Sequence, residues 1–121
     1  MSKNPQGNWG PYGAKGPTFC PFGWAQVNAD GTLAASSGNL QITKGSAGVY
    51  TFQPLDDKGN PLHYPQNGLL ADAQISDGTP SRASILYGIG ATDDGILINT
   101  FNSSNAATNT AFYFKLYTTA V

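Results

Sequence analysis

Apolar and polar residues alternate with a period of two along most of the chain, which is the pattern of strands that bury one face. The clearest case is residues 111–117, AFYFKLY, in which every second side chain is large and apolar. β-Branched and aromatic residues are frequent in the other alternating windows, as strands favour. The pattern predicts strands near residues 23–28, 39–44, 48–53, 69–76, 82–90, 95–101 and 111–118.

The connections between these windows are typical of turns. Residues 28–32, 56–61, 77–80 and 93–95 combine Asp or Asn with Gly, which tolerates the backbone angles that tight turns need. No window shows sustained apolar residues at helical spacing. About seven short strands without helices predict an all-β fold, an antiparallel β-sandwich or jelly-roll-like domain. The expected core consists of Phe112, Phe114, Leu116, Val49 or Tyr50, Phe52, Ile85, Ile89, Ile96 and Ile98.

The first 22 residues have a different composition, rich in glycine, proline and aromatic side chains. Glycine recurs at every third position from Gly7 to Gly16, and proline and glycine at this density favour extended chain and turns over helix. We expect an extended arm over residues 1–22 and a β-sandwich domain over residues 23–121. The arm is expected to dock on a partner; a short triple-helical stub and free disorder are the alternatives. Its expected anchors are Trp9, Tyr12, Phe19 and Phe22.

The outward face of the last strand is expected to carry Tyr113 and Tyr117. Tyrosine has an apolar ring and a polar tip, and it is enriched at interfaces between subunits. These two residues are therefore a candidate subunit contact. The alternative is that they complete the core of the sandwich.

Charge and cysteine content exclude several classes of protein. The six Lys and Arg residues are scattered and balanced by seven Asp and Glu, so the chain lacks the clustered positive charge that nucleic-acid binding needs. No apolar run is long enough for a membrane span, and no export signal is visible. The single Cys20 cannot form an internal disulfide, which fits synthesis in a reducing compartment, and we expect it to be a buried or partly buried apolar residue.

Catalytic and metal-binding patterns are missing from the sequence. His63 is the only histidine, and no nucleophile motif accompanies it. Asp56, Asp57 and Asn60 could offer oxygens to calcium, but they lack the spacing of a calcium loop. We expect no enzymatic activity, no cofactor and no metal.

Three segments together resemble a known class of proteins. They are the opening strand and turn at residues 23–33 (GWAQVNADGTL), the strand at residues 48–52 (GVYTF) and the aromatic closing strand at residues 111–117. With this pattern, the chain resembles small β-sandwich modules in virion proteins of tailed bacteriophages. Such modules occur in capsid decoration (cement) proteins and in fibre or spike tips.

The resemblance implies a trimeric, non-enzymatic virion component, made in the host cytoplasm and located on the capsid surface. Its partner would be the major capsid protein, and by bridging capsid subunits it would stabilise the head. A tail fibre or spike tip, or a β-sandwich module that binds carbohydrate or a receptor, is the alternative. Because the chain starts at Met1 and carries only a short arm, we favour the decoration protein.

Overall fold

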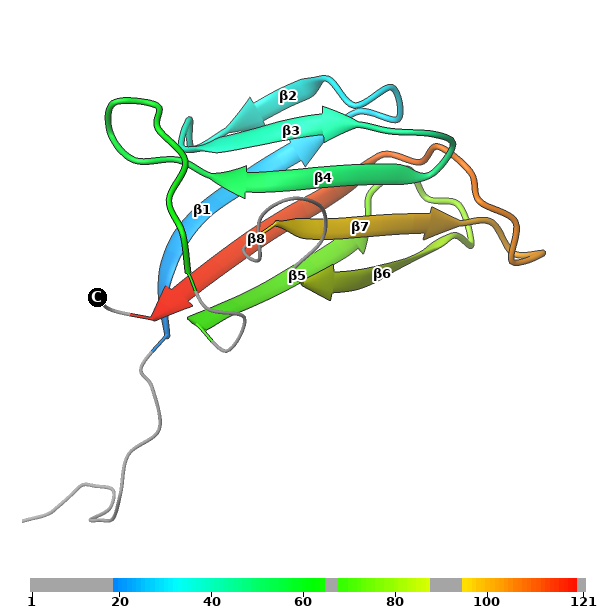
Figure 1. The fold of residues 1–121 in the computed structure, drawn as a ribbon. Helices are drawn as coiled ribbons and strands as arrows, with labels where there is room; N and C mark the ends of the chain where they lie inside the picture. The colour runs from blue at the N-terminus through cyan, green and yellow to red at the C-terminus, as the bar shows by residue number, and fades with distance from the viewer. Residues whose placement is uncertain (1–18, 65–67, 88–94, 120–121) are drawn as a thin grey trace, which may run out of the picture.

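The computed structural model describes residues 19–64, 68–87 and 95–119, and they form an all-β fold of two antiparallel sheets (Figure 1). One sheet has the strand order β2-β1-β8-β5 and the other has the order β3-β4-β7-β6. The strands are β1 (Phe19–Val27), β2 (Leu33–Ser36), β3 (Leu40–Lys44), β4 (Val49–Pro54), β5 (Leu69–Ile75), β6 (Arg82–Tyr87), β7 (Ile96–Phe101) and β8 (Phe112–Thr119).

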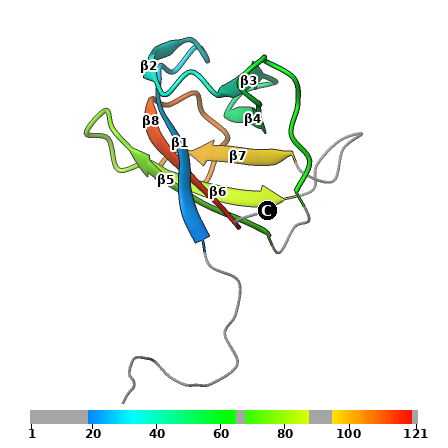
Figure 2. The ribbon, with the colours of Figure 1, turned by 90° about the vertical axis from the view of Figure 1, so that its left-hand side faces the viewer.

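The two sheets pack face to face as the layers of a sandwich. Figure 2 shows β2, β8 and β5 on one side and β3, β4 and β7 on the other. Alternation along the strands places every second side chain between the layers, as in β8, where buried and outward positions alternate from Phe112 to Thr119. The buried hydrophobic residues are Ala25, Val27, Leu40, Tyr50, Phe52, Leu69, Ile96, Ile98, Phe112, Phe114 and Leu116.

Aromatic rings from β4 and β8 link the two sheets at the centre of this core. Phe52 and Phe114 are stacked with 3.9 Å between ring centroids, and Tyr50 meets Phe112 edge to face at 4.9 Å. Such pairs contribute about 0.5–1.5 kcal/mol each beyond the burial of their area. They fix how the sheets lie on each other, and therefore also how their outward sides are presented.

Polar groups at one end of the sandwich tie its loops together. The buried Tyr50 hydroxyl donates a hydrogen bond to the Ala29 carbonyl at 2.7 Å and accepts one from the Thr110 amide at 3.2 Å. Burial raises the pKa of Tyr50. The Gly48 amide donates to Asn109 Oδ1 at 2.8 Å. The turn after β1, the turn before β4 and the segment before β8 are thereby joined.

The structure confirms the predicted all-β antiparallel sandwich and most of its core. It has eight strands over the described residues, because the unpredicted β2 adds one to the expected seven. All four residues of β2 lie outside the buried core, so the strand shows no alternation to detect. Of the expected core, Tyr50 and not Val49 is buried, Ile85 is half-buried, and Ile89 lies outside the described residues.

The first strand also begins earlier than predicted, at Phe19 and not near residue 23. A bulge between Pro21 and Gly23 shifts the register, and pairing with β8 continues on both sides of it, from Phe19 opposite Thr119 to Val27 opposite Phe112. Residues 19–22, which the sequence assigned to the arm, therefore belong to the sheet. The rest of the expected arm lies outside the described residues.

Candidate functional site

The outward side of the β2-β1-β8-β5 sheet carries a group of aromatic, amide and charged side chains that we call the outer face. It comprises Trp24 and Gln26 of β1, Tyr113, Lys115 and Tyr117 of β8, and Leu70, Asp72 and Gln74 of β5. Alternation places these residues opposite the core, since their neighbours Phe112, Phe114 and Leu116 are buried.

Strand register arranges the outer face in rows that cross β1, β8 and β5. The first row is Trp24, Lys115 and Asp72, which are direct partners across the strands. The next row is Gln26, Tyr113 and Gln74. Side chains in such rows have Cβ atoms about 5 Å apart, close enough to act on one ligand. Each row thus combines an aromatic ring with hydrogen-bonding groups.

Three large apolar side chains of the outer face are unusually exposed. The exposed fractions are 46% for Trp24, 45% for Tyr113 and 48% for Leu70. Scattered single exposures of this kind need no explanation, but here they lie on three adjacent strands of one sheet. Grouping of this kind is typical of a surface that meets a ligand or a partner.

A groove lies on the β1 side of the outer face. Its volume is about 460 Å³, and it is lined by Pro21, Phe22, Gly23, Trp24, Ser37, Lys115, Leu116 and Tyr117. The bulge in β1 produces it, because the extra residue breaks the alternation between Pro21 and Gly23. The volume lies within the range of about 300–1,000 Å³ that small-molecule sites occupy.

Hydrogen bonds from the loop after β2 hold the bulge in place. Asn39 Nδ2 donates to the Phe22 carbonyl at 2.8 Å, and the Ser37 hydroxyl donates to Asn39 Oδ1 at 2.6 Å. The Ser37 amide donates to the Trp24 carbonyl at 2.9 Å. A Cβ atom on Gly23 would lie 2.5 Å from Asn39 Oδ1, so glycine allows this close approach without a shift of the Asn39 side chain. The groove is therefore built into the fold.

Two of the four predicted arm anchors, Phe19 and Phe22, belong to the described residues. Trp9 and Tyr12 lie outside the described residues. Phe19 begins β1 and lies opposite Thr119. Phe22 packs half-buried against the domain's own core and meets Tyr64 edge to face, with 6.2 Å between ring centroids. Docking by these four residues on a partner stays a prediction, and Phe22 already has contacts within its own domain.

Tyr113 and Tyr117 lie on the outer face as the alternation indicated. Tyr113 is exposed, so it does not complete the core, and Tyr117 is half-buried at the groove. Whether a subunit covers them stays a prediction. Sequence reasoning missed Trp24 as their neighbour, because the register between β1 and β8 is not visible in either strand alone.

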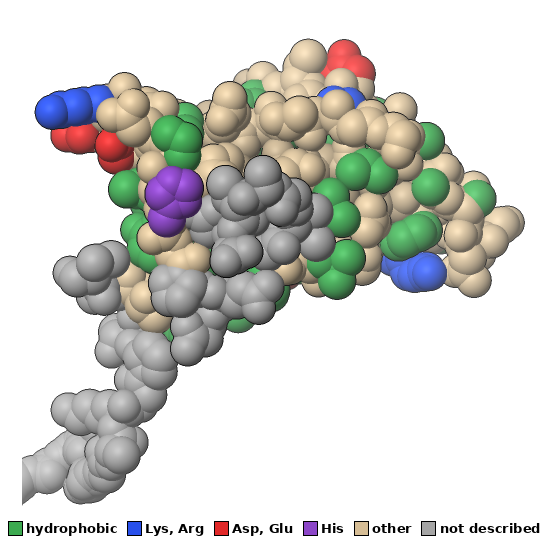
Figure 3. Space-filling model, in the orientation of Figure 1, with side chains coloured by type: hydrophobic (Ala, Val, Ile, Leu, Met, Phe, Trp, Pro, Cys, Tyr) green, Lys and Arg blue, Asp and Glu red, His purple; other side chains and the backbone are tan. Residues whose placement is uncertain are grey.

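The opposite face of the sandwich combines threonine and leucine positions with an arginine, Arg82, that lies 4.8 Å from the centre of the Phe101 ring. Figure 3 shows that side, with scattered apolar patches and with charged side chains near its margins. One row across its strands consists of Thr43, Thr51, Leu97 and Leu86. Leu86 is its single large apolar side chain with high exposure among the described residues, at 48%.

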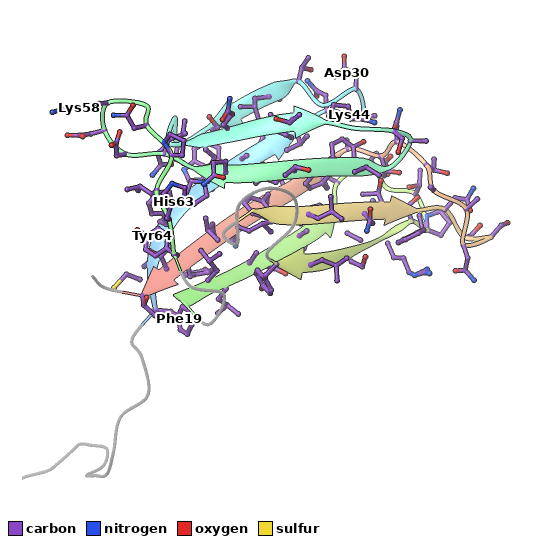
Figure 4. All side chains as sticks on the ribbon, viewed as in Figure 1. Phe19, Asp30, Lys44, Lys58, His63 and Tyr64 are labelled. Atoms are coloured by element: carbon purple, nitrogen blue, oxygen red, sulfur yellow. The ribbon has the colours of Figure 1, made fainter. Side chains whose placement is uncertain are left out.

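Three aspartates in the described part of the chain accept hydrogen bonds that stabilise turns. Asp30, Asp56 and Asp77 have pKa values below the usual range, because they accept hydrogen bonds from Thr32, from the Asn60 amide and from Thr79. Figure 4 shows His63 on the segment after β4, at the end of the sandwich where Phe19 lies and away from Asp30. No three His, Cys, Asp or Glu side chains of residues 19–64, 68–87 and 95–119 lie close enough to hold a metal ion.

Cys20 departs from its prediction. It was expected to be buried or partly buried, but it is exposed near the start of β1. Its partner across the strands is Thr118, and the bulge that follows lies between Cys20 and the part of β1 that packs on the core.

Comparisons with known protein families, with curated proteins and with solved structures find no match for this chain. Among the residues that the structure describes, no helix is long and apolar enough to cross a membrane. The features that bear on function are therefore the outer face, the ends of the sandwich and the sequence pattern.

Proposed function

We propose that the protein is a bacteriophage virion component without enzymatic activity, and specifically a trimeric capsid decoration protein. On this proposal it is made in the host cytoplasm, binds the major capsid protein and stabilises the head by bridging capsid subunits. Two features support it: the strand and turn pattern that resembles such proteins, and a chain with few charges and a formal net charge of −1.

One structural observation carries the proposal. β1 enters the sandwich at the end where β8 leaves it, because Phe19 is the partner of Thr119 (Figure 1). Residues before Phe19 are therefore attached at that end of the domain. If these residues bind a capsid, the sandwich is attached by one end. Both sheet faces and the loops at the other end are then left uncovered.

Binding through such a segment would stabilise a capsid by mass action. A ligand that binds only the assembled state favours it by RT ln(1 + [L]/Kd), which is about 2.7 kcal/mol per site at a hundredfold excess over Kd. Aromatic side chains are the preferred anchors of small interfaces. Trp9 and Tyr12 supply them in the segment that precedes Phe19.

Two finer parts of the proposal concern fold and assembly. A jelly-roll description is supported by the nested pairing of β1 with β8 and of β4 with β7. The homotrimer is proposed on the resemblance alone, with Tyr113 and Tyr117 as a candidate contact between its subunits. The exposed ring of Tyr113 suits a subunit contact or a ligand site equally.

Deleting residues 1–18 tests the proposal. The cut preserves all of β1, whereas a cut after residue 22 would remove the strand residues Phe19 to Phe22. We expect the full chain to sediment with undecorated capsids and the shortened chain to stay in the supernatant with an unchanged β-sheet circular dichroism spectrum. A Leu86→Ser variant of the full chain serves as the control and should sediment with capsids. Full occupancy by the shortened chain would refute attachment through this segment.

A fibre or spike tip that recognises a receptor is the second candidate. The outer face favours it, because Trp24 and Tyr113 are exposed beside amides and charges of both signs. A chain that binds host cells and ignores capsids in the same assays would support this candidate over decoration.

A further inference from the structure

We propose that the outer face binds a neutral oligosaccharide. This inference goes beyond capsid attachment and does not depend on it, because attachment is proposed for residues before Phe19. It assigns Tyr113 and Tyr117 to a ligand instead of to a neighbouring subunit.

The aromatic rings of the outer face are suited to packing against sugar rings. A pyranose ring has a flat face of C–H groups that packs on an indole or phenol ring, and the ring quadrupole attracts the slightly positive hydrogens. Trp24 and Tyr113 are each nearly half exposed on adjacent strands of a sheet. Tyr117 lines the groove beside Trp24. The rings are therefore accessible to a ligand lying on the sheet.

The charged residues of the outer face are suited to hydrogen bonds with sugar hydroxyl groups. Lys115 and Asp72 are direct partners across β8 and β5, so the row that begins at Trp24 ends in one cation and one anion. A sugar hydroxyl both donates and accepts hydrogen bonds, so neighbouring hydroxyls can satisfy an ammonium and a carboxylate together. An anionic ligand would meet Asp72 and a cationic one Lys115. The pair thus favours a neutral polyhydroxylated ligand.

The second row also combines an aromatic ring with hydrogen-bonding groups, but these are uncharged and the ring is on β8 instead of on β1. Gln26 and Gln74 flank Tyr113 on both sides. Each amide side chain offers one acceptor and two donors, the same combination that a hydroxyl-bearing ring can satisfy. Rings on the adjacent strands β1 and β8, each beside hydrogen-bonding groups, give two places on which sugar rings could pack, which suits an oligosaccharide.

The dimensions fit a short oligosaccharide better than a protein. From Tyr113 to Tyr117 the strand rises about 13 Å, and the three strands span about 10 Å, at roughly 3.3 Å per residue and 4.8 Å per strand. A stable protein interface covers about 800 Å² on each partner. A protein bound here would have to extend beyond these three strands. The groove of about 460 Å³ between Trp24 and Tyr117 gives room for sugar at one end.

The test uses the full chain and soluble sugars, without capsids. The chain has two tryptophans, so a Trp9→Phe variant leaves Trp24 as the only indole reporter. It is titrated with neutral hexasaccharides of glucose, galactose, mannose and N-acetylglucosamine, and with a hexamer of galacturonic acid. We expect at least one neutral hexasaccharide to change the Trp24 fluorescence, and the acidic hexamer to bind more weakly.

Variants then locate the site by calorimetry. Trp24→Ala should weaken binding about tenfold or more, which corresponds to the loss of one aromatic contact and its buried area. Lys115→Met and Asp72→Asn should each weaken binding by a smaller factor. Leu86→Ala is the matched control, because Leu86 has nearly the same exposed fraction on the opposite face; it should leave the affinity unchanged.

Three results would overturn the inference. The first is no signal with any neutral hexasaccharide at millimolar concentration, and the second is binding of the acidic hexamer alone. The third is a fall in sedimentation coefficient for Trp24→Ala or Tyr113→Ala, which would identify the outer face as a contact between copies. None of these results bears on capsid sedimentation by residues 1–18, so the two proposals can fail separately.

Discussion

The two sheets of the sandwich have equivalent inner sides and different outer sides. Inward, β4 and β8 contribute matching aromatic rings, such as Phe52 and Phe114, which stack on each other. Outward, one sheet presents the row Trp24, Lys115 and Asp72, while the other presents Thr43, Thr51, Leu97 and Leu86. Threonine and leucine at such positions are ordinary strand formers. An exposed tryptophan beside a paired cation and anion is not required by strand formation.

This difference shows where folding leaves the sequence free. Core positions are restricted by packing, since a change in side-chain volume there disturbs the close-packed neighbours. Outward positions tolerate many residues. Outward residues that are not common strand formers therefore indicate a function rather than a contribution to stability. On the outer face these residues include an exposed tryptophan beside a lysine and an aspartate, and on the opposite face they include Arg82, which lies over the Phe101 ring.

The largest predicted effect tests whether the inner sides form one core. Phe114→Ala should lower the free energy of unfolding by about 3–5 kcal/mol, because it removes a stacked ring and leaves a cavity between the sheets. Tyr113→Ala, the neighbouring outward position, should cost about 1 kcal/mol or less. Urea denaturation measures both. Equal losses for the two variants would mean that Tyr113 is not an outward residue.

A smaller effect is expected for the bulge that shapes the outer face. Gly23→Ala places a Cβ atom 2.5 Å from Asn39 Oδ1 and 2.8 Å from Ser37 Oγ. These side chains must shift, which disturbs the hydrogen bonds that hold the bulge, at a cost of about 1–3 kcal/mol. Thermal unfolding measures the loss, and chemical shifts of Trp24 and Ser37 report the movement. Ala35→Ser on the neighbouring strand is the control, and an unchanged melting temperature for Gly23→Ala would contradict the geometry.

Acid should destabilise the whole domain, because three of its turns contain hydrogen-bonded carboxylates. Hydrogen bonds from Thr32, the Asn60 amide and Thr79 lower the folded pKa of Asp30, Asp56 and Asp77. The unfolded chain then binds more protons at low pH, so this stabilisation is complete above the unfolded pKa and is lost as the pH falls through the folded values. Melting temperatures from pH 6 to pH 2 measure it. A variant with all three changed to Asn should show a flatter curve, and an equally steep one would assign the acid effect elsewhere.

The smallest stability effect sharpens the comparison most. Trp24→Ser and Leu86→Ser change side chains of nearly equal exposed fraction on opposite faces. Each should alter the free energy of unfolding by about 0.5 kcal/mol or less. Only the first should change binding to a ligand of the outer face. If both variants bind alike, the contrast between the two faces has no functional meaning.

Much of the fold could be predicted from the sequence, because alternation survives wherever one strand face is buried. β8 and β4 were found for this reason, and so were their core aromatics. β2 was missed because its residues lie outside the core. The start of β1 was missed because residues 19–22 share the proline-rich and aromatic composition of the expected arm, while a bulge lets pairing with β8 continue there. Tyr113 could be placed on an outward face from β8 alone. Its neighbours Gln26 and Gln74 could not, because register across strands is set by tertiary packing.

The pairing of Phe19 with Thr119 also determines how the domain would respond to load. Pulling these two residues apart would peel β1 from β8 one hydrogen bond at a time, which is the weak direction of an antiparallel pair. A load between Phe19 and a ligand bound at Trp24 acts differently, because both residues belong to β1 and the covalent backbone of that strand carries the load. A protein held before Phe19 and loaded through the outer face would therefore be pulled along its strong direction.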